Sequence, residues 1–203
     1  MFYGRGAENR LSRRDGYCIV TLSWVFFTLF GMLPFYLSGS IDSLTNAFFE
    51  TMSGFTTTGA TILDDIESLS HGMLFWRSLT QWIGGLGIVF FTIAVLPVFT
   101  SGGVQLFSAE STGVTHDRTH PKINVMAKWL WTVYLILTLA ETILLMLGGM
   151  SLFDAVCQSF ATTATGGYST KQASISYWNS PFIEYVVAIF MLCLLYTSPS
   201  PRD

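Results

Sequence analysis

The sequence predicts an all-α integral membrane protein made of two parallel repeats, each with a spanning helix, a half-length re-entrant segment and a second spanning helix. Two observations indicate this fold class. The 203 residues are 51% hydrophobic and only 11% charged, whereas soluble domains contain roughly 25% charged residues. In addition, long stretches with at most one charged residue and half-length apolar segments occur in the order long, half-length, long, twice along the chain. Soluble, disordered and fibrous proteins are therefore nearly excluded.

The long uncharged stretches have the length of membrane-spanning helices. The first covers 21 residues, from Tyr17 to Leu37, and a helix of that length rises about 31 Å, enough to cross a bilayer. We expect Pro34 to kink this helix near its end. The other expected spans are Leu79–Phe99, Trp129–Met150 and Pro181–Tyr196. The last has 16 residues, which is short of the roughly 20 that a span needs.

These stretches divide the chain into five parts. They are an N-terminal segment 1–16, a first repeat 17–99, a polar loop 100–126, a truncated second repeat 127–196 and a tail 197–203. We expect the tail, with its two prolines, not to belong to the native protein. A short natural tail is the alternative.

Lysine and arginine residues predict the orientation of the spans. Residues 1–16 contain four arginines and residues 100–128 contain three basic residues, whereas residues 38–75 contain none and residues 148–180 only Lys171. The positive-inside rule therefore places the N-terminus and the central loop in the cytoplasm. The half-length regions then face outside, and their acidic side chains would concentrate cations there. These acidic residues are Asp42, Glu50, Asp64, Asp65, Glu67 and Asp154.

The two half-length segments resemble each other. Ser43–Ser53 and Ser151–Ala161 share Ser-Leu and Ala at an offset of 108 residues, and each leads into a run of threonine and glycine. This pattern indicates an internal duplication. Gly59 matches Gly166 at an offset of 107 or Gly167 at an offset of 108, and the sequence leaves both registers open.

A half-length segment between two spans must turn back within the membrane. As a helix, 11 residues rise about 16 Å and end near the middle of the bilayer. Ser43 and Ser151 are expected N-caps, and Ser151 with Asp154 has the capping-box spacing. The C-terminal end of such a helix carries a partial negative charge, which favours a cation.

The chain returns outward through the two Thr/Gly runs, which are candidate ion-binding segments. Glycine permits backbone angles that align successive carbonyl groups, and a ring of carbonyl oxygens can replace the hydration shell of an ion. The candidate residues are Thr56, Thr57, Thr58 and Gly59 in the first Thr/Gly run, and Thr163, Ala164, Thr165, Gly166 and Gly167 in the second. Four such segments complete a ring, and this chain supplies two. Turns in ordinary outer loops are the alternative, but two copies, each after a half-length helix, favour a pore.

Three stretches resemble the TrkH/TrkG/KtrB superfamily of potassium uptake proteins. They are residues 47–60, 75–87 and 161–169, within a similarity that covers nearly all of residues 10–195. The resemblance implies four helix–pore-loop–helix repeats around one potassium pathway in a bacterial cytoplasmic membrane, of which this sequence shows the first two. The backbone positions that it implies for ion coordination are Thr57, Thr58, Gly59, Ala164, Thr165 and Gly166. In related plant transporters a serine at the first filter position accompanies sodium permeation, and Gly59 resembles the potassium-selective form.

The resemblance also implies partners. They are the membrane lipids, a cytoplasmic nucleotide-binding regulatory subunit of the TrkA or KtrA type, and a second copy of the full-length subunit. The formal charge of −3 is too small to indicate a nucleic-acid partner. Because no catalytic triad, metal-ligand cluster or phosphate loop occurs in the sequence, we expect no enzyme activity and no organic cofactor, with potassium as the one bound ion. A non-conducting membrane anchor or scaffold is the alternative, although it leaves the Thr/Gly runs unexplained.

Two charged residues lie in apolar surroundings. Glu141 is 12 residues into the third expected span, and an intramembrane carboxyl group is a candidate polar site, with a purely structural role as the alternative. Arg77 lies at the start of the second span, where it could pair with Asp64, with Asp65 or with the outer backbone of the candidate ion-binding segments. Its alternative role is that of an interfacial anchor.

Overall fold

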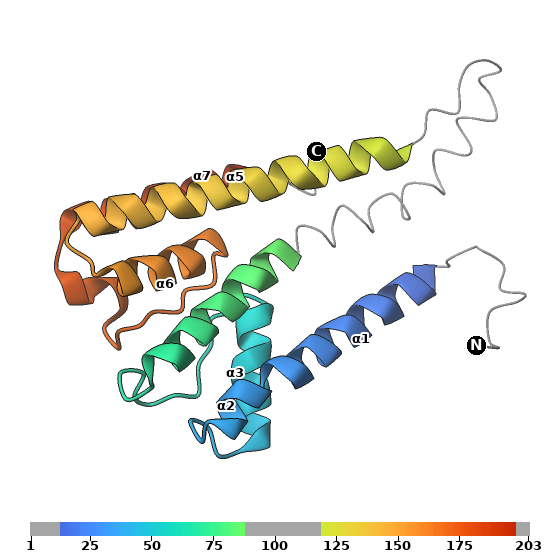
Figure 1. Cartoon of the computed structure of the whole chain (residues 1–203), viewed down its shortest axis with the longest axis horizontal. Helices are drawn as coiled ribbons and strands as arrows, with labels where there is room; N and C mark the ends of the chain where they lie inside the picture. The colour runs from blue at the N-terminus through green and yellow to red at the C-terminus, as the bar shows by residue number, and fades with distance from the viewer. Residues whose placement is uncertain (1–12, 88–118, 198–203) are drawn as a thin grey trace, which may run out of the picture.

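The computed structural model describes residues 13–87 and 119–197, and every regular element in these two ranges is a helix (Figure 1). Most of the expected N-terminal segment, the second half of the second span, most of the central loop and nearly all of the tail lie outside the described residues. The division of the chain at these points stays a prediction.

The described part of the first repeat contains four helical segments. They are α1 (Arg13–Gly31), α2 (Leu33–Leu37), α3 (Leu44–Phe55) and a helix over residues 71–87. The expected break of the first long helix occurs at Met32, and Pro34 lies in the first turn of α2. Proline fits there because the first helical positions need no hydrogen bond from their backbone N–H.

The second repeat has the same order of long, half-length and long helix, with a short 3-10 helix after the half-length one, where the first repeat has the short α2 before it. Its elements are α5 (Thr119–Leu147), α6 (Leu152–Thr163), the short 3-10 helix η1 (Ser174–Trp178) and α7 (Pro181–Thr197). Helix α5 begins ten residues before the expected Trp129, because the uncharged stretch marks only the apolar part of a longer helix. The expected fourth span corresponds closely to α7.

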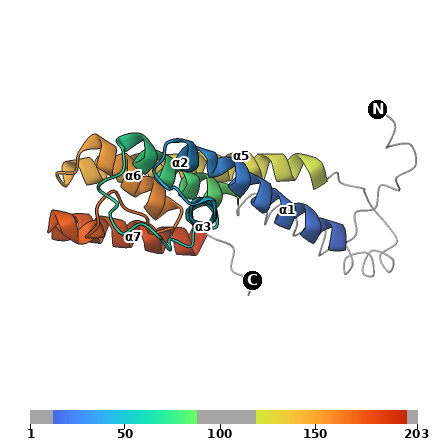
Figure 2. The same ribbon diagram turned by 90° about the horizontal axis from the view of Figure 1, so that it is seen from below.

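The two repeats run in the same direction. The N-terminal ends of α1 and α5 lie on one side of the molecule, and the loops that follow α3 and α6 lie toward the opposite side (Figure 1). Within the second repeat α6 packs against both α5 and α7, and it lies between them in the view of Figure 2. Within the first repeat α1 and α2 pack against α3. This parallel arrangement agrees with the predicted duplication.

The helix over residues 71–87 connects the two repeats. Its Trp76 Nε1 donates a hydrogen bond of 3.0 Å to the carbonyl oxygen of Gly31 in α1. Further along, the Trp82 ring lies 5.5 Å from the ring of Tyr134 in α5 and 5.2 Å from that of Phe160 in α6. One helix of the first repeat therefore contacts all three of these helices.

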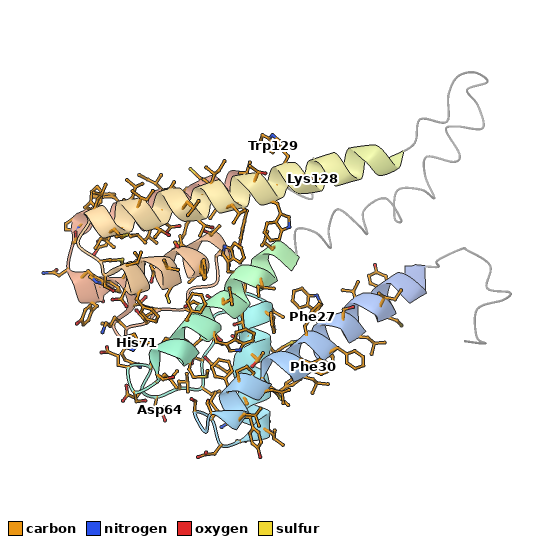
Figure 3. The ribbon with its side chains drawn as sticks, in the orientation of Figure 1. Phe27, Phe30, Asp64, His71, Lys128 and Trp129 are labelled. Atoms are coloured by element: carbon orange, nitrogen blue, oxygen red, sulfur yellow. The ribbon has the colours of Figure 1, made fainter. Side chains whose placement is uncertain are left out.

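Two stretches are long and apolar enough to cross a membrane among the described residues, Gly16–Leu37 and Lys128–Leu147, and Pro181–Leu194 forms a shorter apolar helix. Only 17% and 22% of the two long stretches are buried, whereas the core helix of a soluble protein would be mostly buried. Figure 3 shows Phe27 and Phe30 on α1, and both side chains are exposed. Such faces suit contact with lipid or with further membrane helices.

Candidate functional site

Helices α3 and α6 each end at the start of one of the two Thr/Gly runs. Both expected N-caps are found, at Ser43 and Ser151. The Ser151 hydroxyl accepts a hydrogen bond of 3.1 Å from the backbone N–H of Asp154 and donates one of 2.7 Å to its carboxylate, whereas the Ser43 side chain makes no capping bond. Both helices end two residues later than expected, with Thr56 and Ala164 as C-caps.

The two Thr/Gly runs have the same backbone conformation at an offset of 108 residues. Thr57 and Thr165 have φ angles of 53° and 52°, and Gly59 and Gly167 have φ angles of 77° and 80°. The geometry therefore pairs Gly59 with Gly167 rather than with Gly166. The same offset relates the hydrogen bonds that close the helix ends, from Thr58 N–H to Ser53 O and from Gly166 N–H to Ala161 O, at 2.9 and 2.8 Å.

This register moves the implied coordinating positions of the second repeat by one residue. By backbone geometry, the counterparts of Thr57, Thr58 and Gly59 are Thr165, Gly166 and Gly167 instead of Ala164, Thr165 and Gly166. Ala164 and Thr163 are buried at the end of α6. Thr163 also receives a hydrogen bond of 3.4 Å from the Thr138 hydroxyl of α5.

The two runs lie directly against each other. A Cβ atom added to Gly59 would overlap with the carbonyl oxygen of Gly166. Gly166 is buried, whereas Thr58, Thr165 and Gly167 are exposed in this chain. In the first run the hydroxyl groups of Thr56 and Thr58 are hydrogen-bonded to each other at 2.8 Å, and Thr56 also donates to the carbonyl of Met52. The predicted segments therefore form one continuous site.

A buried ion pair lies beside the two Thr/Gly runs and contacts the chain that follows the second run. Arg77 Nε lies 2.7 Å from Glu50 Oε1, and both side chains are almost completely buried. Arg77 Nη1 donates a hydrogen bond of 3.1 Å to the carbonyl of Ser169, and its guanidinium lies 3.6 Å from the centre of the Tyr168 ring. Of the partners expected for Arg77, the outer backbone is contacted, at Ser169 just beyond the second Thr/Gly run. Among the described contacts its carboxylate partner is Glu50 instead of Asp64 or Asp65.

Glu50 fixes the chain that leaves the first run. Its carboxylate accepts hydrogen bonds from the Thr61 hydroxyl at 2.9 Å and from the Ile62 N–H at 3.0 Å. The Tyr168 hydroxyl reaches the Glu50 carbonyl at 2.9 Å and the Ala60 carbonyl at 3.2 Å. Glu50 therefore does not belong to the acidic outer face on which the sequence placed it. Counting charges along a loop does not distinguish a solvated carboxylate from a buried, paired one.

The outer loops also join the two repeats. Lys171 Nζ lies 3.4 Å from a Glu67 carboxylate oxygen, and the Ile66 N–H donates to the Gln172 side chain at 3.2 Å. Asp64 is exposed on this side (Figure 3), as are Asp42 and Asp65. Acidic side chains next to the site therefore remain exposed without Glu50.

Glu141 lies on α5, which packs against α6, near Thr163 at the start of the second Thr/Gly run. Its side chain has 0% exposure, and neither carboxyl oxygen has a hydrogen-bond partner within the described ranges. The hydroxyl groups of Thr162 and Thr163 lie in its neighbourhood without reaching hydrogen-bonding geometry. Glu141 is thus a polar group behind the second Thr/Gly run, and its role stays a prediction.

A further polar side chain, Gln81, was not predicted as part of the site. Its amide bonds to Gly166 and Tyr168 of the second repeat, about 85 residues away in sequence. The available signal was a glutamine within the uncharged Leu79–Phe99 stretch, because a polar side chain inside a membrane usually has a partner.

Together, the parallel repeats, the half-length helices and the paired Thr/Gly runs define a helical membrane protein of the helix–pore-loop–helix class. A family model described as "TrkH: Cation transport protein" matches residues 4–193. The chain therefore belongs to the TrkH family of cation transport proteins.

Several curated relatives are named as Trk system potassium uptake proteins. The chain is 46% identical over 190 residues to the Trk system potassium uptake protein TrkH of Escherichia coli K12, and 37% identical over 185 residues to TrkG of the same strain. These alignments cover 93% and 90% of this chain but only 39% and 38% of the relatives. The chain thus spans about two fifths of the length of the relatives it matches.

A solved structure shares the fold. The crystal structure of the potassium transporter TrkH from Vibrio parahaemolyticus superposes with a TM-score of 0.77 at 39% sequence identity. The superposition covers 92% of this chain and 37% of that one. The helical membrane fold predicted from the sequence is therefore confirmed.

Proposed function

We propose that this chain supplies two of the pore loops of a potassium-uptake protein in the bacterial cytoplasmic membrane. The observation that supports it most is the pairing of the two Thr/Gly runs, which share one backbone conformation and lie against each other. Each run follows the C-terminal end of a half-length helix, where the partial negative charge favours a cation. The names of the relatives, all potassium uptake proteins, point to the same substrate.

In this proposal the coordinating atoms are backbone carbonyl oxygens of Thr57, Thr58 and Gly59 in the first run and of Thr165 and Gly167 in the second, because the Gly166 carbonyl accepts the Gln81 hydrogen bond. Carbonyl oxygens replace the water around potassium, which is the transported ion rather than a resident cofactor. Two loops give an ion only part of its coordination shell. We therefore propose that transport requires further loops, as in the longer relatives.

We also propose what surrounds the chain in the cell. The exposed apolar faces of α1 and α5 would contact lipid or neighbouring helices. The Lys and Arg distribution places the N-terminus in the cytoplasm. A cytoplasmic nucleotide-binding subunit of the TrkA or KtrA type and a second copy of the full-length subunit are the proposed protein partners.

The experiment uses a chimera in which this chain replaces the matching segment of the Escherichia coli relative. In a strain that lacks potassium uptake, the chimera should restore growth at low potassium. Gly59→Ser should then lower the ratio of potassium to sodium uptake, because the new Cβ has no space and Gly59 has a φ of 77°. A loss of about 1.4 kcal/mol for potassium alone would lower the ratio about tenfold.

Gly72→Ser is the matched control, because a Cβ at Gly72 would meet nothing within 4 Å. It should leave the ratio unchanged. A chimera that reaches the membrane in normal amount but takes up no potassium would favour the anchor or scaffold alternative. An unchanged ratio in Gly59→Ser, at normal expression, would mean that the first Thr/Gly run does not select the ion.

A further inference from the structure

A helix of the first repeat holds the backbone of the second Thr/Gly run. Gln81, in the helix over residues 71–87, donates a hydrogen bond of 2.8 Å from Nε2 to the carbonyl oxygen of Gly166. Its Oε1 accepts a bond of 3.2 Å from the N–H of Tyr168. The side chain has 0% exposure, so water does not compete for either bond. One primary amide therefore satisfies an acceptor and a donor on the same short segment.

Arg77 extends this contact by one helical turn. Residues four apart lie on the same face of a helix, and Arg77 accordingly reaches the next part of the segment, with its bond to the Ser169 carbonyl and its stacking over the Tyr168 ring. Glu50 neutralises the guanidinium from the first half-length helix. Two side chains on one helix face thus hold Gly166, Tyr168 and Ser169.

The contact is particular to the junction between the first and second repeats. If α7 is matched to the helix over residues 71–87 at offsets of 108, 109 or 110, the counterpart of Gln81 is Ile189, Phe190 or Met191. None of these side chains can form either bond. The Gln81 contact is therefore not a general property of the repeat that both copies inherit.

The position of Gln81 also affects the first Thr/Gly run. The Gly166 carbonyl that Gln81 holds is the atom with which a Gly59 Cβ would overlap, and that Cβ would lie 3.9 Å from Gln81 Nε2. The orientation of the Gly166 peptide therefore determines the space between the two runs. If the peptide turned its carbonyl away from Gln81, the oxygen would move relative to Gly59.

We infer that Gln81 is a positioning residue for ion selectivity, which fixes the Gly166–Tyr168 backbone and, through Gly166, the separation of the two Thr/Gly runs. This inference rests on the proposed function, because selectivity is defined only for a transporting protein. Gln81 itself does not contact the ion. It acts by holding the Gly166 peptide in one orientation relative to Gly59.

The test uses the same chimera and measures potassium and sodium uptake separately, together with the amount of protein in the membrane. Gln81→Met conserves volume and removes both bonds, and Gln81→Glu keeps the acceptor for Tyr168 but removes the donor to Gly166. Each variant should lower the potassium-to-sodium ratio by about threefold or more, because a misplaced peptide changes the two ion affinities unequally. If one variant fails to reach the membrane, the other decides the question.

Trp76→Phe is the matched control. It also removes one side-chain donor from the same helix, but that donor bonds to Gly31 in α1 and not to the second run. The ratio should stay unchanged in this variant. A uniform loss of uptake for both ions in the Gln81 variants, with the ratio intact, would show a structural role only and would overturn the inference.

A double variant separates this inference from the proposed function. If Gln81 and Gly59 act through the same peptide, Gln81→Met combined with Gly59→Ser should lower the ratio no further than the stronger single variant. An altered ratio in Gly59→Ser with an unaltered ratio in both Gln81 variants refutes the inference alone. No potassium uptake by the parent chimera refutes the proposed function.

Discussion

Gly166 and Gly167 are neighbours in sequence, but different physical constraints require glycine at each. Gly167 has a φ of 80°, with open space where a Cβ would lie. At Gly166 no positive φ is involved, but a Cβ would overlap with the side-chain amide of Gln81. The first glycine is therefore required by a neighbouring side chain and the second by its own backbone angles.

These constraints predict different costs for alanine at the two positions. Gly166→Ala displaces Gln81 and leaves buried polar groups unpaired, at about 1–3 kcal/mol for each group. Gly167→Ala costs about 1–2 kcal/mol through the left-handed backbone alone. Thermal denaturation of the purified chimera in detergent should therefore show the larger loss for Gly166→Ala. A larger loss for Gly167→Ala would contradict this assignment.

At the residue scale, the Thr/Gly runs and a contact of Arg77 with the outer backbone were predicted, but the contacts of Glu50 and Gln81 were not. The runs are recognisable because the pattern is local and occurs twice. Glu50 and Arg77 are 27 residues apart and Gln81 and Gly166 are 85 apart, so their contacts depend on how the repeats pack. The register of the second run likewise required backbone angles, which a pattern of threonine and glycine does not determine.

At the scale of elements, the half-length helices were predicted well. Their starts follow from serine at Ser43 and Ser151, and their ends lie two residues beyond the expected ones. The first and third spans were also predicted closely, since Gly16–Leu37 and Lys128–Leu147 are long and apolar enough to cross a membrane. Helix α5 begins earlier than its span, at Thr119, because hydropathy identifies the part of a helix that crosses lipid and not its polar extension.

The two N-caps offer a matched pair for a stability test. Ser151→Ala removes a side-chain cap from α6, which costs about 1 kcal/mol. Ser43→Ala should cost much less, because the Ser43 hydroxyl makes no capping bond to α3. The thermal midpoints of the two chimera variants, measured side by side in detergent, check this difference. Equal losses would show that the hydroxyl bond to Asp154 contributes nothing to α6.

At the scale of the whole molecule, the parallel repeats predict one topology. With the N-terminus inside, the loop that contains Glu67 lies outside, and the polar loop that contains Thr115 lies inside. In a variant without Cys18, Cys157 and Cys193, a membrane-impermeant thiol reagent added to intact cells should label Glu67→Cys and not Thr115→Cys. The opposite pattern would reject the orientation.

The contact between Gln81 and the second run also has a consequence for biosynthesis. A ribosome completes Gln81 before Gly166, and the 85 residues between them correspond to roughly 4–17 s of bacterial translation. Gln81, which holds the second run, is therefore already synthesised when that run emerges from the ribosome. A second repeat synthesised alone, or placed ahead of the first by circular permutation, would emerge before any Gln81 side chain was available to bind it. The duplicated halves are consequently not interchangeable modules, because only the first supplies the side chain that holds the second Thr/Gly run.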